Sequence, residues 1–216
     1  MPERFEFRSD INAFCLANWA LHHFINPELY RRDAQDGNSA LLWAAEHGQT
    51  ATARMSLQHG GDVSAEDGNG NPALLIAAGE GHIPLTELLL DNSADLECHD
   101  EYLHTPLAEA ALKGHTDMVR RLLDRGATLE SKGATGLAVL SLAIQREHEE
   151  VAMLLLDRGT DIESRDNIGK TPLHFAAGKG SQMVVQQLVN RGATIDARDG
   201  RGKTPLMVAS RGGSRR

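Results

Sequence analysis

Apolar and polar positions recur along this chain with a step of 33 residues. The segment Leu-Leu-Asp-Arg-Gly stands at 122–126 and again at 155–159, and a related segment stands at 188–192. Alanine pairs follow the same step, at 44–45, 77–78, 110–111 and 176–177. The triplet Thr-Pro-Leu stands at 105–107, 171–173 and 204–206. A period of this length predicts a stack of repeated units, each of which buries its apolar face against its neighbours.

Each unit has the pattern of two short helices and an extended finger. Thr105 and Thr171 stand where a hydroxyl can cap the first helix. The proline that follows each of them occupies the first helical position, where a backbone N–H would have no partner within the helix. The alanine pairs let neighbouring helices approach closely. Glycines suited to a left-handed backbone follow the first helix at 81, 114 and 180 and the second helix at 126, 159 and 192. The pattern therefore predicts an all-α fold, with fingers such as 194–198 leading into the next unit.

The clearest unit runs from Asp166 through Gly169 and Thr171-Pro172-Leu173-His174 to Leu188 and Gly192-Ala193, and it resembles an ankyrin repeat. The resemblance covers residues 34–216. It implies an ankyrin solenoid of helix-turn-helix units with a finger turn in each. The units are 34–66, 67–99, 100–132, 133–165 and 166–198, followed by a partial unit at 199–216.

Some positions depart from this pattern. Glu147 stands where unit 133–165 should have a glycine after its first helix, and Ser93 replaces a glycine after the second helix of unit 67–99. A left-handed backbone at such residues costs on the order of 1 kcal/mol. The partial unit has no second helix, so we expect the flank of unit 166–198 (Val184, Val185, Leu188 and Val189) to be only half covered. Self-association through this end is therefore a possible consequence.

Residues 1–33 do not match the repeat. Apolar residues at near-helical spacing begin at about residue 11, and two interpretations stay open. The segment is either a helical N-terminal cap of the first unit or a remnant F-box. Residues 10–32, which end in Asn-Pro-Glu-Leu-Tyr-Arg-Arg, resemble the later part of the F-box in fungal F-box/ankyrin proteins. The opening Leu-Pro helix of that family is absent or reduced to 2–5, so a role as substrate receptor of a ubiquitin ligase requires that the remnant still functions.

Composition and charge narrow the class of protein. Hydrophobic residues make up 41% and charged residues 24% of the 216 residues, the balance of a folded soluble protein. No apolar run approaches the roughly 18 residues of a membrane helix, and no signal peptide is visible. The two cysteines form neither a disulfide framework nor a zinc site. The net charge of −8 argues against nucleic-acid binding. We expect an intracellular protein, in the cytoplasm or the nucleus.

The sequence shows no catalytic, cofactor or metal motif. His82, His115 and His148 recur where the second helix opens, which indicates a structural role. No two histidines have the spacing of a zinc site on a helix. We therefore predict a protein that is not an enzyme and has no cofactor or metal. The alternative is a small-molecule binder or enzyme with acid/base groups in one pocket, drawn from His104, Glu109, Glu80 and Lys113.

Positions that the repeat leaves free are the candidates for binding a partner protein. In ankyrin proteins they are the finger tips and the exposed face of the first helix, which together line a concave groove. Charge along the chain is uneven, with 12 acidic and 5 basic residues in 67–132 against 3 and 10 in 165–216, which suits a partner of segregated charge. The predicted contact residues are Trp43, His47, Asn71, Glu80, Tyr102, His104, Glu109, Lys113, Arg146, Lys170, Phe175, Lys179, Arg201 and Lys203.

Overall fold

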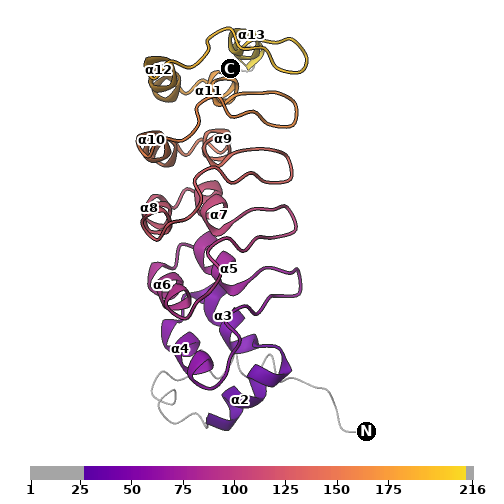
Figure 1. Ribbon diagram of the computed structural model, residues 1–216, viewed down its shortest axis with the longest axis vertical. Coiled ribbons are helices and arrows are strands. Elements are labelled where there is room, and N and C mark those ends of the chain that lie inside the picture. Colours follow the sequence, from indigo (N-terminus) through magenta and orange to yellow (C-terminus); the bar gives the residue numbers. More distant parts are fainter. Residues whose placement is uncertain (1–26, 213–216) are drawn as a thin grey trace. The chain divides into compact units, whose positions relative to one another are not determined.

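The structure, a computed structural model, describes residues 27–212, and its secondary structure is helical (Figure 1). Over these residues the extended pairings are two isolated bridges, Glu66 with Pro72 and Lys132 with Ala138. The predicted all-α fold is confirmed. The chain divides into two compact units, Met1–Asp95 and Leu96–Arg216, which we call the first and the second half and describe separately.

The first half contains five described helices: α2 (Pro27–Asp36), α3 (Ser39–His47), α4 (Thr50–Gln58), α5 (Ala73–Gly79) and α6 (Ile83–Asp91). Helix α3 packs against α4 and α5, and α6 packs against α4 and α5. Helix α2 contacts α3 and α4, and its Tyr30 is buried with its ring stacked on His59. The predicted N-terminal cap or F-box remnant lies outside the described residues as far as residue 26, and α2 continues beyond the predicted boundary at residue 33.

The second half contains α7 (Pro106–Lys113), α8 (Thr116–Asp124), α9 (Val139–Gln145), α10 (Glu149–Asp157), α11 (Pro172–Lys179), α12 (Gln182–Asn190) and α13 (Pro205–Gly212). Inner helices α7, α9, α11 and α13 pack side by side in that order, and outer helices α8, α10 and α12 form a second layer behind them. The fingers extend from the inner helices, away from the outer layer (Figure 1). Ala110, Ala143 and Ala176 on the inner helices are fully buried, so they allow the close approach expected of alanine.

The helix ends follow the prediction from glycine spacing. Gly114 and Gly180 cap α7 and α11 with φ of 80° and 72°. Glu147 and Ser93 adopt the same left-handed conformation, with φ of 66° and 68°, as their positions in the repeat predict. Thr105 caps α7 by accepting a hydrogen bond from Ala108 N at 3.3 Å. The expected helix-ending chemistry is therefore present, including the two strained exceptions.

The C-terminal flank of unit 166–198 is covered in part, in agreement with the expected half cover. Val184 and Leu188 on α12 are fully buried, because α12 packs against both α10 and α11 and these helices cover that face. Val185 and Val189 are half-buried. The large apolar side chains that are exposed from α12 onward are Met183, Ile195, Leu206 and Met207.

Fingers in the second half are joined by a regular series of main-chain hydrogen bonds. Ala134 N donates to Tyr102 O at 2.7 Å, and Gly200 N donates to Ile168 O at 2.8 Å. Asn167 N makes the equivalent bond to Thr135 O at 3.1 Å. Each finger is therefore held at a fixed register against the next, and side chains at equivalent finger positions are presented in a row.

The repeated histidines His82 and His148 have the structural role that their spacing indicates. His148 Nε2 lies 3.0 Å from Leu112 O, and His82 Nε2 lies 3.2 Å from Glu46 O, the carbonyl oxygen near the end of the preceding inner helix in each case. A Cβ added at Gly114 would lie 2.5 Å from His148 Nδ1. Each of these histidines therefore joins one repeat to the helix end of the repeat before it.

Candidate functional site

The predicted row of residues at the ends of the inner helices is exposed. His47, Lys113 and Lys179 are the last residues of α3, α7 and α11, and Glu80 and Arg146 directly follow α5 and α9. All five side chains are exposed to solvent. Lys179 Nζ forms an ion pair with Glu147 at 2.9 Å. Each half therefore presents exposed polar groups at its helix ends, His47 and Glu80 in the first half and Lys113, Arg146 and Lys179 in the second.

Several predicted residues form contacts between a finger and an inner helix, or within one helix. Lys170 Nζ lies 5.4 Å from the centroid of the Phe175 ring, a cation–π arrangement. His104 and Glu109 occupy the same two repeat positions in unit 100–132, and their side chains are also in contact. In the first half, the rings of Trp43 and His47 stack with centroids 4.6 Å apart.

The remaining predicted residues on the fingers lie around an aspartate that accepts backbone hydrogen bonds. Asn71 Nδ2 donates to Asp67 Oδ2 at 3.1 Å. The backbone N–H groups of Arg201 and Lys203 both donate to Asp199 Oδ1 at 2.8 Å. The Arg201 side chain is exposed and that of Lys203 is half-buried. These turns fix the finger backbone and leave the side chain of Arg201 directed to solvent.

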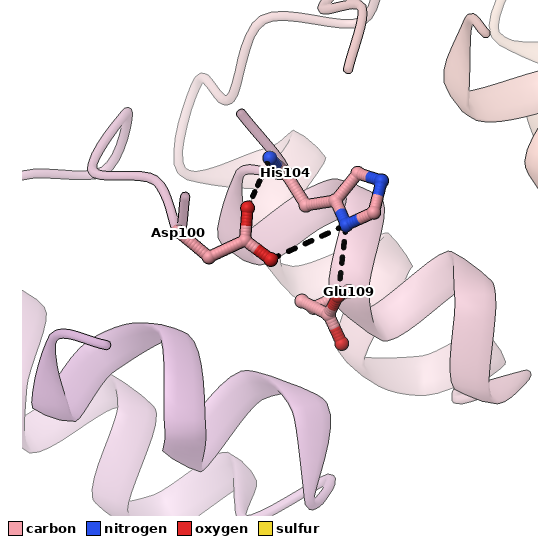
Figure 2. A group of neighbouring side chains, drawn as sticks. All are labelled: Asp100, His104 and Glu109. Atoms are coloured by element: carbon pink, nitrogen blue, oxygen red, sulfur yellow. Dashed lines mark hydrogen bonds and ion pairs between the residues drawn. The ribbon is translucent and has the colours of Figure 1, made fainter. Parts of the chain in front are cut away.

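Asp100, His104 and Glu109 converge at the base of the finger at 100–104, which we call the third finger (Figure 2). His104 Nδ1 lies 3.4 Å from Asp100 Oδ2 and 3.2 Å from Glu109 Oε1. Asp100 Oδ1 accepts the backbone N–H groups of Tyr102 and His104 at 2.9 and 2.8 Å, which leaves Oδ2 facing the imidazole. The three side chains are only 10–18% exposed.

The cluster alters the acid/base behaviour of His104. Its hydrogen bond with Glu109 raises the pKa of the imidazole, burial opposes this effect, and the charges of Asp100 and Glu109 reinforce the increase. In the described part of the chain, no hydrogen bond or ion pair joins Lys113 to His104 or Glu109. Of the acid/base set proposed for an enzyme, the structure of the second half brings His104 and Glu109 into contact.

Gly133 lies against the His104 ring on the side away from the carboxylates. A Cβ added there would lie 2.9 Å from His104 Cδ2 and 3.1 Å from its Nε2. The equivalent position is aspartate in units 67–99, 100–132, 166–198 and 199–216. The sequence reasoning missed Asp100 and Gly133, although this break in a 33-residue series of aspartates was a usable signal.

Leu103 was also missed. It is 47% exposed at the tip of the third finger, beside Tyr102, which is 58% exposed. Its backbone is left-handed, with φ of 61°. The residues one or more 33-residue steps away are all glycines of positive φ: Gly37, Gly70, Gly136, Gly169 and Gly202. The replacement of glycine by Leu103 can be seen in the repeated sequence, but only the left-handed backbone shows that this leucine is strained.

Comparison with known families assigns the chain. A family model described as ankyrin repeats, in three copies, matches residues 12–100, 41–133, 76–166 and 140–216. The chain belongs to the ankyrin-repeat family. Ankyrin repeats are generally protein–protein interaction modules and typically lack enzymatic activity. Comparison with curated proteins finds no match.

Two further findings bear on the sequence-based expectations. The ankyrin match begins at residue 12, and nothing in the comparisons supports the F-box-like interpretation of residues 10–32. Among residues 27–212, no helix is both long enough and apolar enough to cross a membrane.

Proposed function

We propose that this ankyrin array is an adaptor that binds a partner protein through its finger tips and inner helices, with the finger of unit 100–132 as a principal contact. The supporting observation is Leu103. A left-handed backbone at a residue other than glycine costs on the order of 1–2 kcal/mol. Because about half of the Leu103 side chain stays exposed, its burial offsets little of this cost.

Strain that stability does not require is a reason to examine a position for function. Tyr102 and Leu103 are two exposed, largely apolar side chains side by side at this finger tip. The other fingers have glycine at the position of Leu103. Aromatic side chains surrounded by polar groups are frequent centres of binding energy in protein interfaces. Lys113 is exposed at the end of α7, in the same unit as this finger.

A narrower version of the proposal is a substrate receptor for a ubiquitin ligase. It depends on the F-box resemblance of residues 10–32 alone, and binding through the finger tips and inner helices does not require it. The predicted contact residues of the other units, from Trp43 to Lys203, stay part of the proposed surface and extend it along each half of the chain.

The test begins with affinity capture by the full chain and identification of captured proteins by mass spectrometry. Affinity for the captured partner is then compared between the wild-type chain and the double variant Tyr102→Ala with Lys113→Ala. We expect at least a tenfold loss, about 1.4 kcal/mol, with a nearly unchanged melting temperature.

The matched control is Arg120→Ala with Arg121→Ala, which removes two exposed side chains from outer helix α8. This variant should bind as the wild-type chain does. If the control abolishes binding while the Tyr102 and Lys113 double variant binds normally, the partner contacts the outer helices and the proposal is wrong.

A further inference from the structure

Three potential metal ligands converge within unit 100–132. The carboxylate of Asp100, the Nδ1 atom of His104 and the carboxylate of Glu109 place their nearest atoms all within 4.8 Å of one another. With bonds of about 2.1 Å to a tetrahedral zinc ion, neighbouring ligand atoms lie about 3.4 Å apart. The two nitrogen–oxygen distances, 3.4 and 3.2 Å, therefore already correspond to edges of such a coordination shell.

Among the described residues, the two carboxylates of the cluster face one basic side chain, His104. Over the described residues, Asp100 and Glu109 form ion pairs with His104 and with no lysine or arginine. Glu109 occupies a position that holds Trp43, Ile76, Leu142 and Phe175 in other units, so the repeat does not require an acid there. A divalent cation would neutralise both of these partly desolvated carboxylates, whereas a protonated His104 neutralises only one of them.

The three groups are also held in place by their surroundings. Two backbone N–H groups fix Asp100 Oδ1 and leave Oδ2 for a further ligand, as outer hydrogen bonds commonly do at metal sites. Gly133 leaves room for the opposite edge of the imidazole, so that Nδ1 faces the carboxylates (Figure 2). Glu109 is fixed on α7, whose first turn is capped by Thr105.

We propose that Asp100, His104 and Glu109 form a binding site for one divalent transition-metal ion, with Zn²⁺ as the best fit. One imidazole and two carboxylates suit Zn²⁺, whereas Ca²⁺ and Mg²⁺ take oxygen ligands. Three protein ligands leave a fourth position for water, as in zinc sites that are not closed. The imidazole coordinates in its neutral form, with Nδ1 as the ligand and the proton on Nε2.

The binding test uses the untagged full chain, freed of metal with a chelator and titrated with Co²⁺. The visible spectrum of Co²⁺ reports the number and type of its ligands. We expect one equivalent to bind, with visible bands and without the near-ultraviolet bands of thiolate ligands, and Zn²⁺ should displace it. Multiple weak sites, or a thiolate band from a cysteine, would overturn the proposal.

Two variants use residues that other repeats already tolerate at the same positions. His104→Asn introduces the side chain that Asn71 supplies beside Asp67, and Glu109→Leu introduces the side chain of Leu142. Each should lower Co²⁺ affinity at least tenfold, in line with the effect of losing support at metal sites. His47→Asn removes an exposed histidine from another repeat and should leave the affinity unchanged. Equal affinity in all three variants and the wild-type chain contradicts the site.

A second measurement does not depend on these variants. Zn²⁺ should raise the melting temperature of the wild-type chain, because a ligand that binds the folded state stabilises it. Asp100→Asn keeps an oxygen that can accept the two backbone hydrogen bonds but loses the charged ligand, so its melting temperature should not respond to Zn²⁺. A wild-type chain that shows no response, or an Asp100→Asn variant that responds equally, counts against the proposal.

Discussion

Gly133 lies directly against the imidazole of His104, across the boundary between two repeats. The space that it leaves is filled by the ring, because a Cβ at this position would lie 2.9 Å from His104 Cδ2 and 3.2 Å from Tyr102 O. Four other units have aspartate at this position. The exchange of aspartate for glycine in one repeat thus accommodates a histidine in the repeat before it.

We expect Gly133→Ala to lower the free energy of unfolding by about 1–3 kcal/mol, the usual cost of overpacking. The φ angle of Gly133 is not positive, so the loss should arise from the clash with His104 and Tyr102 rather than from backbone strain. Denaturant unfolding of Gly133→Ala, His104→Asn and the double variant forms a double-mutant cycle. Part of the loss should disappear in the double variant, and strictly additive losses would exclude a contact between the two residues.

Leu103 offers a test of the strained finger tip. Leu103→Gly should be about 1 kcal/mol more stable than Leu103→Ala, because alanine keeps the Cβ that disfavours a left-handed backbone. The measurement is denaturant unfolding of both variants. Thr135 on the next finger, which has no positive φ, is the control, and there the glycine variant should be the less stable of the pair. If the alanine variant of Leu103 is as stable as the glycine variant, the backbone at this position is not strained.

The fold was predictable because a period is a property of many residues together. The alanine pairs, the Thr-Pro starts and the helix-ending glycines each indicated the same 33-residue unit, and even Glu147 and Ser93 adopted the conformation that their position requires. The half cover expected for the last flank agrees with the burial of Val184 and Leu188 beside the half-buried Val185 and Val189. The buried side chains are covered by α11 of their own unit and by α10 of the preceding unit.

The candidate site was predicted only in part, because it depends on distances that sequence spacing does not give. His104 and Glu109 were chosen as residues that differ from their equivalents, and they do meet. Asp100 was overlooked because every finger of this type uses such an aspartate for its own turn, and its second oxygen matters only where a histidine faces it. Ligand spacing along a single helix does not reveal ligands that are divided between a finger and a helix.

The pKa of His104 should be measurable by nuclear magnetic resonance in the presence of a chelator. We expect a pKa above the ordinary value of 6.5, raised first by the hydrogen bond with Glu109 and further by the charges of Asp100 and Glu109, against the opposing effect of burial. Glu109→Gln should lower it. A pKa that is unchanged by Glu109→Gln would show that this contact is absent in solution.

The same shift predicts a dependence of stability on pH. The folded chain binds the His104 proton more tightly than the unfolded chain does, so the added stability is fully present below the unfolded pKa and is lost as the pH rises through the folded pKa. In a chelator, the difference in unfolding free energy between the wild-type chain and His104→Asn should therefore be larger at about pH 5.5 than at about pH 8.5. A difference that grows toward high pH has the wrong sign for this cluster.

His148 provides the contrast between a repeat histidine and a site histidine. Its ring bonds to Leu112 O at 3.0 Å and packs beside Gly114, so His148→Ala should lower the unfolding free energy by about 1–3 kcal/mol through the unsatisfied carbonyl group and the lost contact. His47→Ala, at an exposed position, should cost less, within about 0.5 kcal/mol if its stacking on Trp43 contributes little. Neither change should alter Co²⁺ affinity, because neither side chain belongs to the Asp100–His104–Glu109 cluster. Denaturant unfolding and the Co²⁺ titration on the same two variants separate the two roles: a large loss of metal affinity in His148→Ala, with stability unchanged, would reverse the assignment of these histidines.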